Sequence, residues 1–315
     1  MPADIESMVY SASETPWHGL GTPIDDTVSF WEAFEKANLN WNVFTEPTYR
    51  KDGTLLRQRV AIRDTDQAEL GSVGPRWTPL QNKDAFKVFE PLVEDGTISL
   101  ETAGSLKGGK RVWVLCKINL DNSEIVKGDE VAKYSLLSNG HDGILGVHFG
   151  FTPIRVVCTN TESMARNSKA SKLIRVRHHK FVQQNVEKLR EVMDFANQEF
   201  EATAEQYRHL ASRGINQSDL QKYLKIVFKL DKKEKDEIST RSKNILGRVE
   251  DLFESGKGTD IPGVKGTYWG AYNAVTEYLN YEKGRTAENR MDSLWYGQNR
   301  DMSELALETA LTLAG

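Results

Sequence analysis

The chain has 315 residues, of which 39% are hydrophobic and 27% charged, so it carries enough apolar residues to form a core. At about 100–200 residues per domain, this length allows one large domain or two. The 7 tryptophans and 12 phenylalanines exclude a disordered chain, because disordered segments are poor in aromatic residues. The net charge of −4 excludes a wholly basic coat for nucleic acid but leaves room for a local basic patch.

We expect neither a membrane-spanning segment nor a secretory signal in this sequence. It has no run of about 18 apolar residues, so we expect no membrane-spanning helix. The first ten residues are acidic and lack the apolar core of a secretory signal. Cys116 and Cys158 lie inside apolar runs and predict buried thiols rather than a disulfide framework. We therefore expect a cytoplasmic protein.

Short alternating segments dominate residues 1–178, and they predict a sheet-rich domain with small helices. Ser29 and Glu32 form a capping box at the start of one helix. Asp52-Gly53 predicts the turn of a hairpin. Pro91 is expected to bend or end a second helix that begins at Asn82. We expect strands over residues 41–49, 55–63, 69–73, 97–103, 110–118, 134–137, 144–149 and 154–158.

Helical periodicity takes over in residues 179–315. Apolar residues recur at steps of three and four over 181–210, which predicts one helix of about 30 residues with a narrow apolar stripe. The stripe is expected to pack against Ile238, Ile245, Val249 and Leu252. Further helices are expected over 218–228, 238–253, 267–281 and 303–313, with a loop over 256–266. The fold class is therefore α+β, with a sheet-rich domain followed by a helical region.

The sequence patterns that are typical of enzymes are incomplete or absent in this sequence. Residues 104–110 match G-x-x-x-x-G-K, but Arg111 replaces the Ser or Thr that holds magnesium, and a strand is expected to follow. The sequence contains no HExxH, CxxC or G-x-S-x-G pattern. His141, His148 and Cys158 have no spacing that is typical of a metal site. We expect no catalytic residue, no metal and no cofactor, and hence no enzyme.

The strongest local signal is a block of positive charge over residues 155–190. Nine basic and two acidic residues give the block a charge of +7, whereas the whole chain carries −4. Such asymmetry is typical of a basic face that binds a polyanion, and the alternative is a solvated loop and helix start. The residues expected to bind nucleic acid in this block are Arg155, Arg166, Lys169, Lys172, Arg175, Arg177 and Lys180.

Two further groups extend this expectation. Lys107, Lys110 and Arg111 lie at the tip of an expected hairpin and offer a second contact with a polyanion. Proteins that bind single strands add aromatic platforms to a basic groove. The aromatic candidates are Trp77, Tyr134, Phe149 and Phe151, and the alternative for each is a place in the core.

Three motifs make the chain resemble a known family. They are Pro16-Trp17-His18-Gly19-Leu20-Gly21, the stretch Tyr134-Ser135-Leu136-Leu137-Ser138-Asn139-Gly140-His141-Asp142-Gly143, and Thr152-Pro153-Ile154-Arg155-Val156-Val157-Cys158-Thr159-Asn160-Thr161. These stretches resemble the phage/plasmid-like protein family, catalogued as domain of unknown function 932, and residues 266–299 fit its C-terminal part. The resemblance implies a phage, plasmid or prophage setting and supplies no catalytic residues.

The order of elements carries a second, weaker resemblance. A short helix over 29–38, a hairpin opened by Trp41, further strands and a helix resemble single-strand annealing recombination proteins of the Rad and Red-beta type. That resemblance implies a homo-oligomer that holds single-stranded DNA or another nucleic acid in a basic groove. Our leading expectation is therefore single-stranded DNA binding or annealing in recombination. Two alternatives stay open, an anti-defence protein that binds a host protein and a metal-dependent nuclease.

Overall fold

The architecture is mixed α+β, with sheets and short helices in the N-terminal half and a helical C-terminal region. The computed structural model describes residues 5–11, 21–25, 28–157, 160–161, 174–178, 190–232 and 237–315. It divides into two compact units: the first comprises residues 1–120, 134–151 and 173–196, and the second comprises 121–133, 152–172 and 197–315. The chain changes unit within two strands, β9 (Asp129–Gly140) and β10 (Val147–Arg155), each of which contributes residues to both units.

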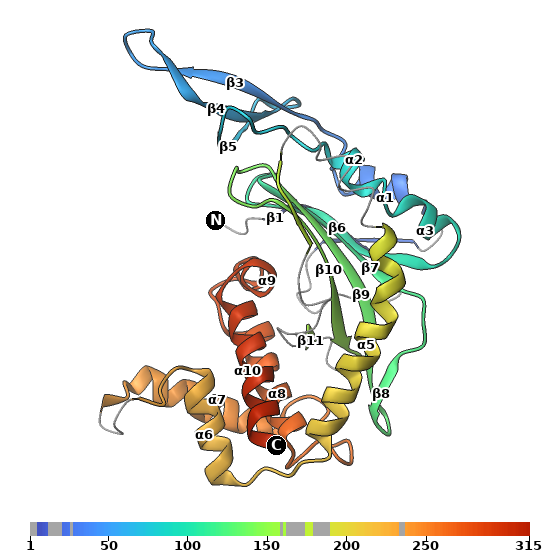
Figure 1. The fold of residues 1–315 in the computed structure, drawn as a ribbon, viewed down its shortest axis with the longest axis vertical. Helices are drawn as coiled ribbons and strands as arrows, with labels where there is room; N and C mark the ends of the chain where they lie inside the picture. Colours follow the sequence, from blue (N-terminus) through green and yellow to red (C-terminus); the bar gives the residue numbers. More distant parts are fainter. Residues whose placement is uncertain are drawn as a thin grey trace. The chain divides into compact units, whose positions relative to one another are not determined.

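The main sheet of the first unit has the order β10-β9-β7-β6-β1-β2, with β12 also paired to β10 (Figure 1). Its strands are β1 (Ile5–Ser11), β2 (Thr22–Ile24), β6 (Ile98–Leu106), β7 (Arg111–Ile118), β9 (Asp129–Gly140), β10 (Val147–Arg155) and β12 (Ile174–Val176). β1 runs parallel to β2, whereas the pairs β1–β6, β6–β7, β7–β9 and β10–β12 are antiparallel. The two strands expected over 144–158 are one strand, β10, and β1 and β2 were not expected.

Short helices pack on this sheet. α1 (Phe30–Lys36) begins at Ser29, whose side chain forms the predicted capping box with Glu32. α1 and α3 (Glu90–Glu94) both contact β6, and Trp31 Nε1 donates a hydrogen bond to the Glu90 carboxylate. Phe34 meets Phe86 of α2 (Asn82–Phe86) edge-on at 5.7 Å between ring centroids. These contacts hold the three short helices together, and α1 and α3 attach the group to β6.

The expected helix that begins at Asn82 is divided into two. α2 ends at Phe86, and Pro91 lies in the first turn of α3 rather than at the end of a helix. A proline is tolerated in a first turn because the N–H it lacks has no partner within the helix there. The expected helix is thus interrupted before Pro91, and Pro91 itself lies in the first turn of the second helix instead of ending the first.

A second, three-stranded sheet carries a protruding hairpin (Figure 1). Its strands are β3 (Val43–Tyr49), β4 (Leu55–Arg63) and β5 (Glu69–Val73), in that order. The predicted turn at Gly53 is confirmed, since this glycine has a φ of +81°. β5 pairs only with residues 59–62 of β4, so the outer part of the hairpin has two strands. We call residues 43–63 the arm.

The base of the arm is fixed by side chains. Trp41 is buried, and the Arg63 guanidinium lies 5.3 Å from its ring centroid. Arg63 also pairs with Asp66 at 2.8 and 2.6 Å. The Gln81 amide accepts from the Val43 N–H at 2.8 Å and donates to the Val43 carbonyl at 2.9 Å. The arm is therefore held at its base and exposed toward its tip.

A tight turn after β9 packs against the second sheet. Asp142 Oδ1 accepts from the N–H groups of Ile144 and Leu145, both at 2.8 Å. Gly143 has a φ of +75°, which favours glycine. At Gly71 of β5, a Cβ atom would lie 2.5 Å from the Asp142 carbonyl oxygen, so only glycine allows this close approach.

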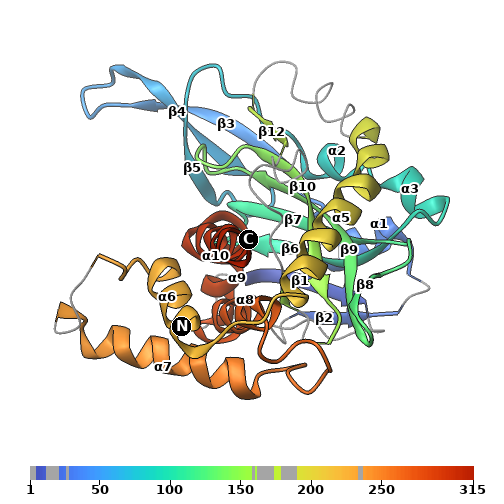
Figure 2. The ribbon, with the colours of Figure 1, turned by 60° about the horizontal axis from the view of Figure 1, so that its bottom comes forward.

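The second unit is mainly helical. Its helices include α6 (Gln217–Val227), α7 (Thr240–Ser255), α8 (Tyr268–Glu277), the π-helical turn η2 (Tyr278–Glu282), α9 (Ala287–Tyr296) and α10 (Gln298–Ala314). Two short strands also belong to it, β8 (Ser123–Val126) paired with β9 and β11 (Asn160–Thr161) paired with β10. α10 contacts α6, α8 and α9, and Figure 2 views it nearly along its axis. α9 was not expected, and Asn216 rather than Ser218 caps α6.

The long helix is confirmed over its described part. α5 (Arg190–Ala211) covers the last 21 residues of the range expected for it, and residues 181–189 lie outside the described chain. Its stripe is buried at Phe200, Tyr207 and Leu210. Tyr207 meets Trp269 of α8 at 4.7 Å between ring centroids. The Tyr207 ring therefore packs against α8, and the expected packing of the stripe against α7 stays a prediction.

None of the described helices is long and apolar enough to cross a bilayer.

A buried histidine makes the stability of the first unit depend on pH. His141 is fully buried, and its Nε2 lies 2.8 Å from Asn82 Oδ1, an atom that only accepts hydrogen bonds. Burial lowers the pKa of His141 to about 3, and the nearby His178 contributes. The neutral ring is therefore the form that the fold holds.

We predict that the free energy of unfolding decreases as the pH falls from about 6.5 toward 3. Over that range the unfolded chain binds a proton at His141 and the folded chain does not, at up to about 1.4 kcal/mol per pH unit. His141→Gln should remove this contribution. Urea unfolding of both proteins between pH 7.5 and 4.5 measures it, and identical pH dependences would contradict the prediction.

Candidate functional site

The predicted basic block is only partly described. Arg166, Lys169, Lys172 and Lys180 lie outside the described residues, and so does the motif that contains Trp17 and His18. Arg175 lies in β12, of which the backbone alone is described, opposite His148 of β10. Arg177 follows β12 and is exposed. Arg177 is therefore the one cation of the block whose described side chain faces solvent.

Arg155 corrects the expectation for the block. Its side chain is buried in the second unit, where Nε and Nη2 donate to the Asp129 carboxylate at 2.8 and 2.7 Å. Its Nη1 donates to the Lys257 carbonyl at 3.1 Å. Trp269 Nε1 donates to the same carboxylate at 2.8 Å, and its ring lies 5.6 Å from the guanidinium carbon. Arg155 is a structural residue and not a surface contact for phosphate.

The second predicted contact is a hairpin turn, as expected. Lys107, Gly108 and Gly109 have φ values of +55°, +65° and +83°, and β7 follows directly. This backbone lacks the helix N-terminus of a nucleotide-binding loop. Lys107 and Lys110 are half-buried, and Arg111 Nε lies 3.4 Å from Asp142 Oδ2. The turn places the three predicted cations together, with the charge of Arg111 partly balanced.

The aromatic candidates separate into core and surface. Tyr134, Phe149 and Phe151 are buried, at 4%, 1% and 9% exposure, so they are core residues rather than platforms. Trp77 is half-buried, and its ring lies 5.1 Å from the His178 ring. The Thr78 N–H also donates to the His178 carbonyl at 3.4 Å. The predicted cation Arg177 is therefore adjacent in the chain to a residue that packs on Trp77.

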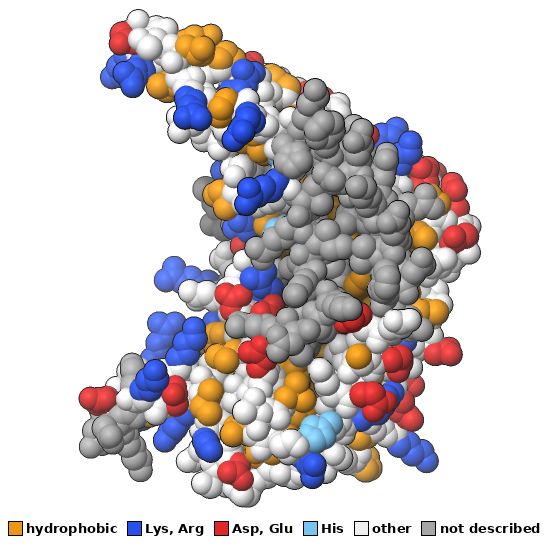
Figure 3. Space-filling view, in the orientation of Figure 1, with side chains coloured by type: hydrophobic (Ala, Val, Ile, Leu, Met, Phe, Trp, Pro, Cys, Tyr) orange, Lys and Arg blue, Asp and Glu red, His pale blue; other side chains and the backbone are white. Residues whose placement is uncertain are grey.

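The arm is a basic element that was not predicted from the sequence. Residues 43–63 carry five basic and two acidic side chains. Arg50, Lys51 and Arg57 are exposed, whereas Arg59 is half-buried and donates to Thr45 Oγ1 at 2.9 Å. Figure 3 shows Lys and Arg side chains along the arm with apolar ones beside them. Strand alternation and the Asp-Gly turn were visible in the sequence, but nothing there indicated that the hairpin extends beyond its sheet.

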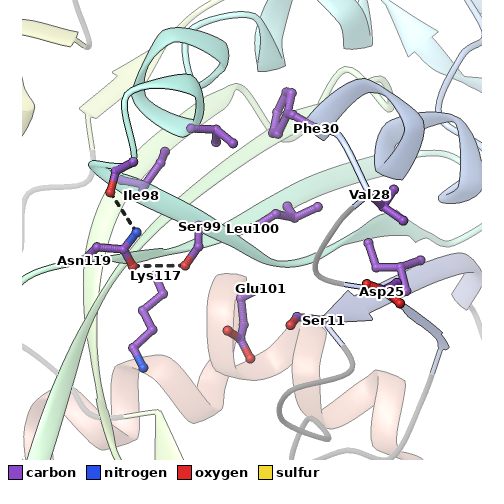
Figure 4. Close-up of a pocket in the computed structure, with 13 residues that line it drawn as sticks. Ser11, Asp25, Val28, Phe30, Ile98, Ser99, Leu100, Glu101, Lys117 and Asn119 are labelled. Atoms are coloured by element: carbon purple, nitrogen blue, oxygen red, sulfur yellow. Dashed lines mark hydrogen bonds between the residues drawn. The ribbon is translucent and has the colours of Figure 1, made fainter.

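A cavity of about 490 Å³ in the first unit has a different character. Asp25, Glu101 and Lys117 line it, and Ser99 Oγ donates to Asn119 Oδ1 at 3.1 Å on its wall (Figure 4). Two carboxylates and one ammonium group make a lining that repels phosphate. We therefore do not place a contact with a polyanion here.

Groups that suit metal or thiol chemistry are not assembled in the described residues. No three His, Cys, Asp or Glu side chains come together there in an arrangement that would hold a metal ion. Cys158 lies outside the described residues, and Cys116 is buried. Burial raises the pKa of Cys116 far above its usual range, so this thiol is held in its unreactive form.

Comparison with protein families gives one match. Residues 69–295 match the model of the family described as Domain of unknown function (DUF932). No curated protein and no solved structure matches the chain.

We predict that Arg155→Met lowers the free energy of unfolding by about 3–5 kcal/mol, because it leaves the Asp129 carboxylate buried without its cation. The double variant Arg155→Met/Asp129→Leu should recover part of the loss. Exposed Arg177→Met is the control and should change the free energy by less than about 1 kcal/mol. Urea unfolding at pH 7 measures all three, and a loss below 1 kcal/mol for Arg155→Met would contradict the prediction.

Proposed function

The chain belongs to the DUF932 family, and we propose that it binds single-stranded DNA without catalysis, to anneal or protect strands in recombination. We propose that it acts for a phage or plasmid in the cytoplasm of a bacterial cell, because its motifs resemble the phage/plasmid-like protein family. The residues that we propose for this role are the basic residues of the segment before α5 and, separately, the exposed cations of the first unit.

The segregation of charge is the observation that carries this proposal. With Arg155 set aside, residues 156–190 still hold eight basic and two acidic residues, in a chain of net charge −4. Such a segment attracts a polyanion and releases the counterions of each phosphate that it contacts. Its Ser, Thr and Asn residues can donate further hydrogen bonds to phosphate oxygens.

Described residues of the first unit support the same function. Arg177 within the segment is exposed, and the arm adds exposed Arg50, Lys51 and Arg57. The turn with Lys107 and Lys110 adds two half-buried lysines. A single strand is favoured over a duplex because the half-buried Trp77 offers a ring on which an unpaired base can stack.

The salt dependence of binding tests the proposal. If the six remaining predicted cations of the block contact phosphates, log K should fall with log salt with a slope of roughly −4 for a single strand. Lys172→Ala/Arg175→Ala should reduce the slope by about 1.4 at every base composition, because phosphate contacts carry no sequence information. Fluorescence anisotropy with labelled oligonucleotides at several salt concentrations measures it.

A matched control removes the same charge elsewhere. Lys222→Ala/Lys243→Ala changes two exposed lysines of the second unit and should leave the slope unchanged. Equal slopes for wild type and Lys172→Ala/Arg175→Ala would refute the role of the block. Absence of binding to any strand by the wild type would refute the function.

Self-association is a second part of the proposal. A homo-oligomer would align several copies of the block along one strand, as annealing requires. Light scattering at micromolar protein, with and without single-stranded DNA, measures the mass. A monomer in both conditions would refute it.

A further inference from the structure

An apolar pair is exposed at the outer end of the arm. Tyr49 and Leu55 are direct cross-strand partners of β3 and β4, and their side chains are 59% and 62% exposed. Directly opposed residues of an antiparallel pair have Cβ atoms about 4.5–5.5 Å apart on the same face. The two side chains therefore form one apolar patch that the described fold leaves in contact with solvent.

Positive charge surrounds this patch. Arg50 and Lys51 follow Tyr49 in the turn, Arg57 lies two residues after Leu55 in β4, and all three side chains are exposed. The single acid among residues 49–57 is Asp52, which leaves a net charge of +2. Asp52 Oδ1 accepts from the Thr54 N–H at 2.9 Å, so its carboxylate serves to shape the turn.

The arm presents this patch from a firm base. Gln81, Trp41 and the pair of Arg63 with Asp66 fix the inner ends of β3 and β4, as described above. Beyond Arg59 the described part of β4 has no pairing with β5, and residues 46–58 are exposed apart from the half-buried Thr48 and Leu56. A contact surface that is ordered before binding costs less conformational entropy when it binds.

We propose that the tip of the arm is a base-stacking contact for single-stranded nucleic acid. In this contact Tyr49 and Leu55 pack against the faces of unpaired bases while Arg50, Lys51 and Arg57 lie at the neighbouring phosphates. A strand of unpaired nucleotides is the ligand that offers flat apolar faces within a row of negative charges. The inference rests on the proposed function and names a second, independent part of the same interface.

Removal of the two side chains tests the contact. Tyr49→Ala/Leu55→Ala should weaken binding to a mixed-sequence oligonucleotide by about 5- to 100-fold, since stacking contributes strongly for each base. The salt slope should stay unchanged because no charge is removed. Tyr49→Phe keeps the ring and should bind as the wild type does. Ile144→Ala, at an 84% exposed residue of the first unit, is the matched control and should have no effect.

An abasic strand of the same length separates stacking from phosphate contact. On this strand the wild type and the double variant should bind equally, because no base is present. Equal loss on both strands, or no loss on either, overturns the inference. If the wild type binds neither strand, the proposed function falls as well, whereas wild-type binding with an unaffected tip variant overturns the inference alone. The melting temperature of each variant confirms that it is folded.

Discussion

The buried pair of Arg155 and Asp129 joins stretches of the second unit that are far apart in the sequence. The guanidinium also reaches the Lys257 carbonyl, and the Trp269 indole donates to the carboxylate. A guanidinium or carboxylate left alone in a protein interior costs several kcal/mol. The strand that ends at Arg155, the β8–β9 hairpin and the start of α8 therefore have to stay together, and every other contact of this unit has to be compatible with that.

The same pair shows where sequence reasoning fails. Arg155 belongs to a run of basic residues, and its charge alone suggested a surface role. The acid that neutralises it is 26 residues earlier, and the tryptophan is more than 100 residues later, so the pairing depends on tertiary structure. Features that depend on local sequence were predicted correctly. The Ser29 cap, the turn at Gly53 and the helical period up to Leu210 each depend on residues within a few positions. The fold class followed from such signals.

The candidate interface was harder to predict than the fold, for a related reason. Tyr134, Phe149 and Phe151 alternate like any aromatic strand residues, and burial decides that they are core. Tyr49 has the same local pattern, yet it lies next to the hairpin turn, beyond the residues at which β4 pairs with β5, and is exposed. Whether an aromatic residue is buried or available for a ligand depends on what packs on its face of the strand, which periodicity does not encode.

The outer edge of β3 has a consequence for assembly. Gln81 occupies the outward N–H and carbonyl of Val43, and Arg59 Nη2 donates to the Thr45 carbonyl at 2.8 Å. Pro47, the next alternate residue, has no N–H to give. Side chains and a proline thus interrupt, over residues 43–47, the ladder that another chain would continue. The arm can therefore display apolar side chains while the inner part of this edge discourages the addition of a fourth strand.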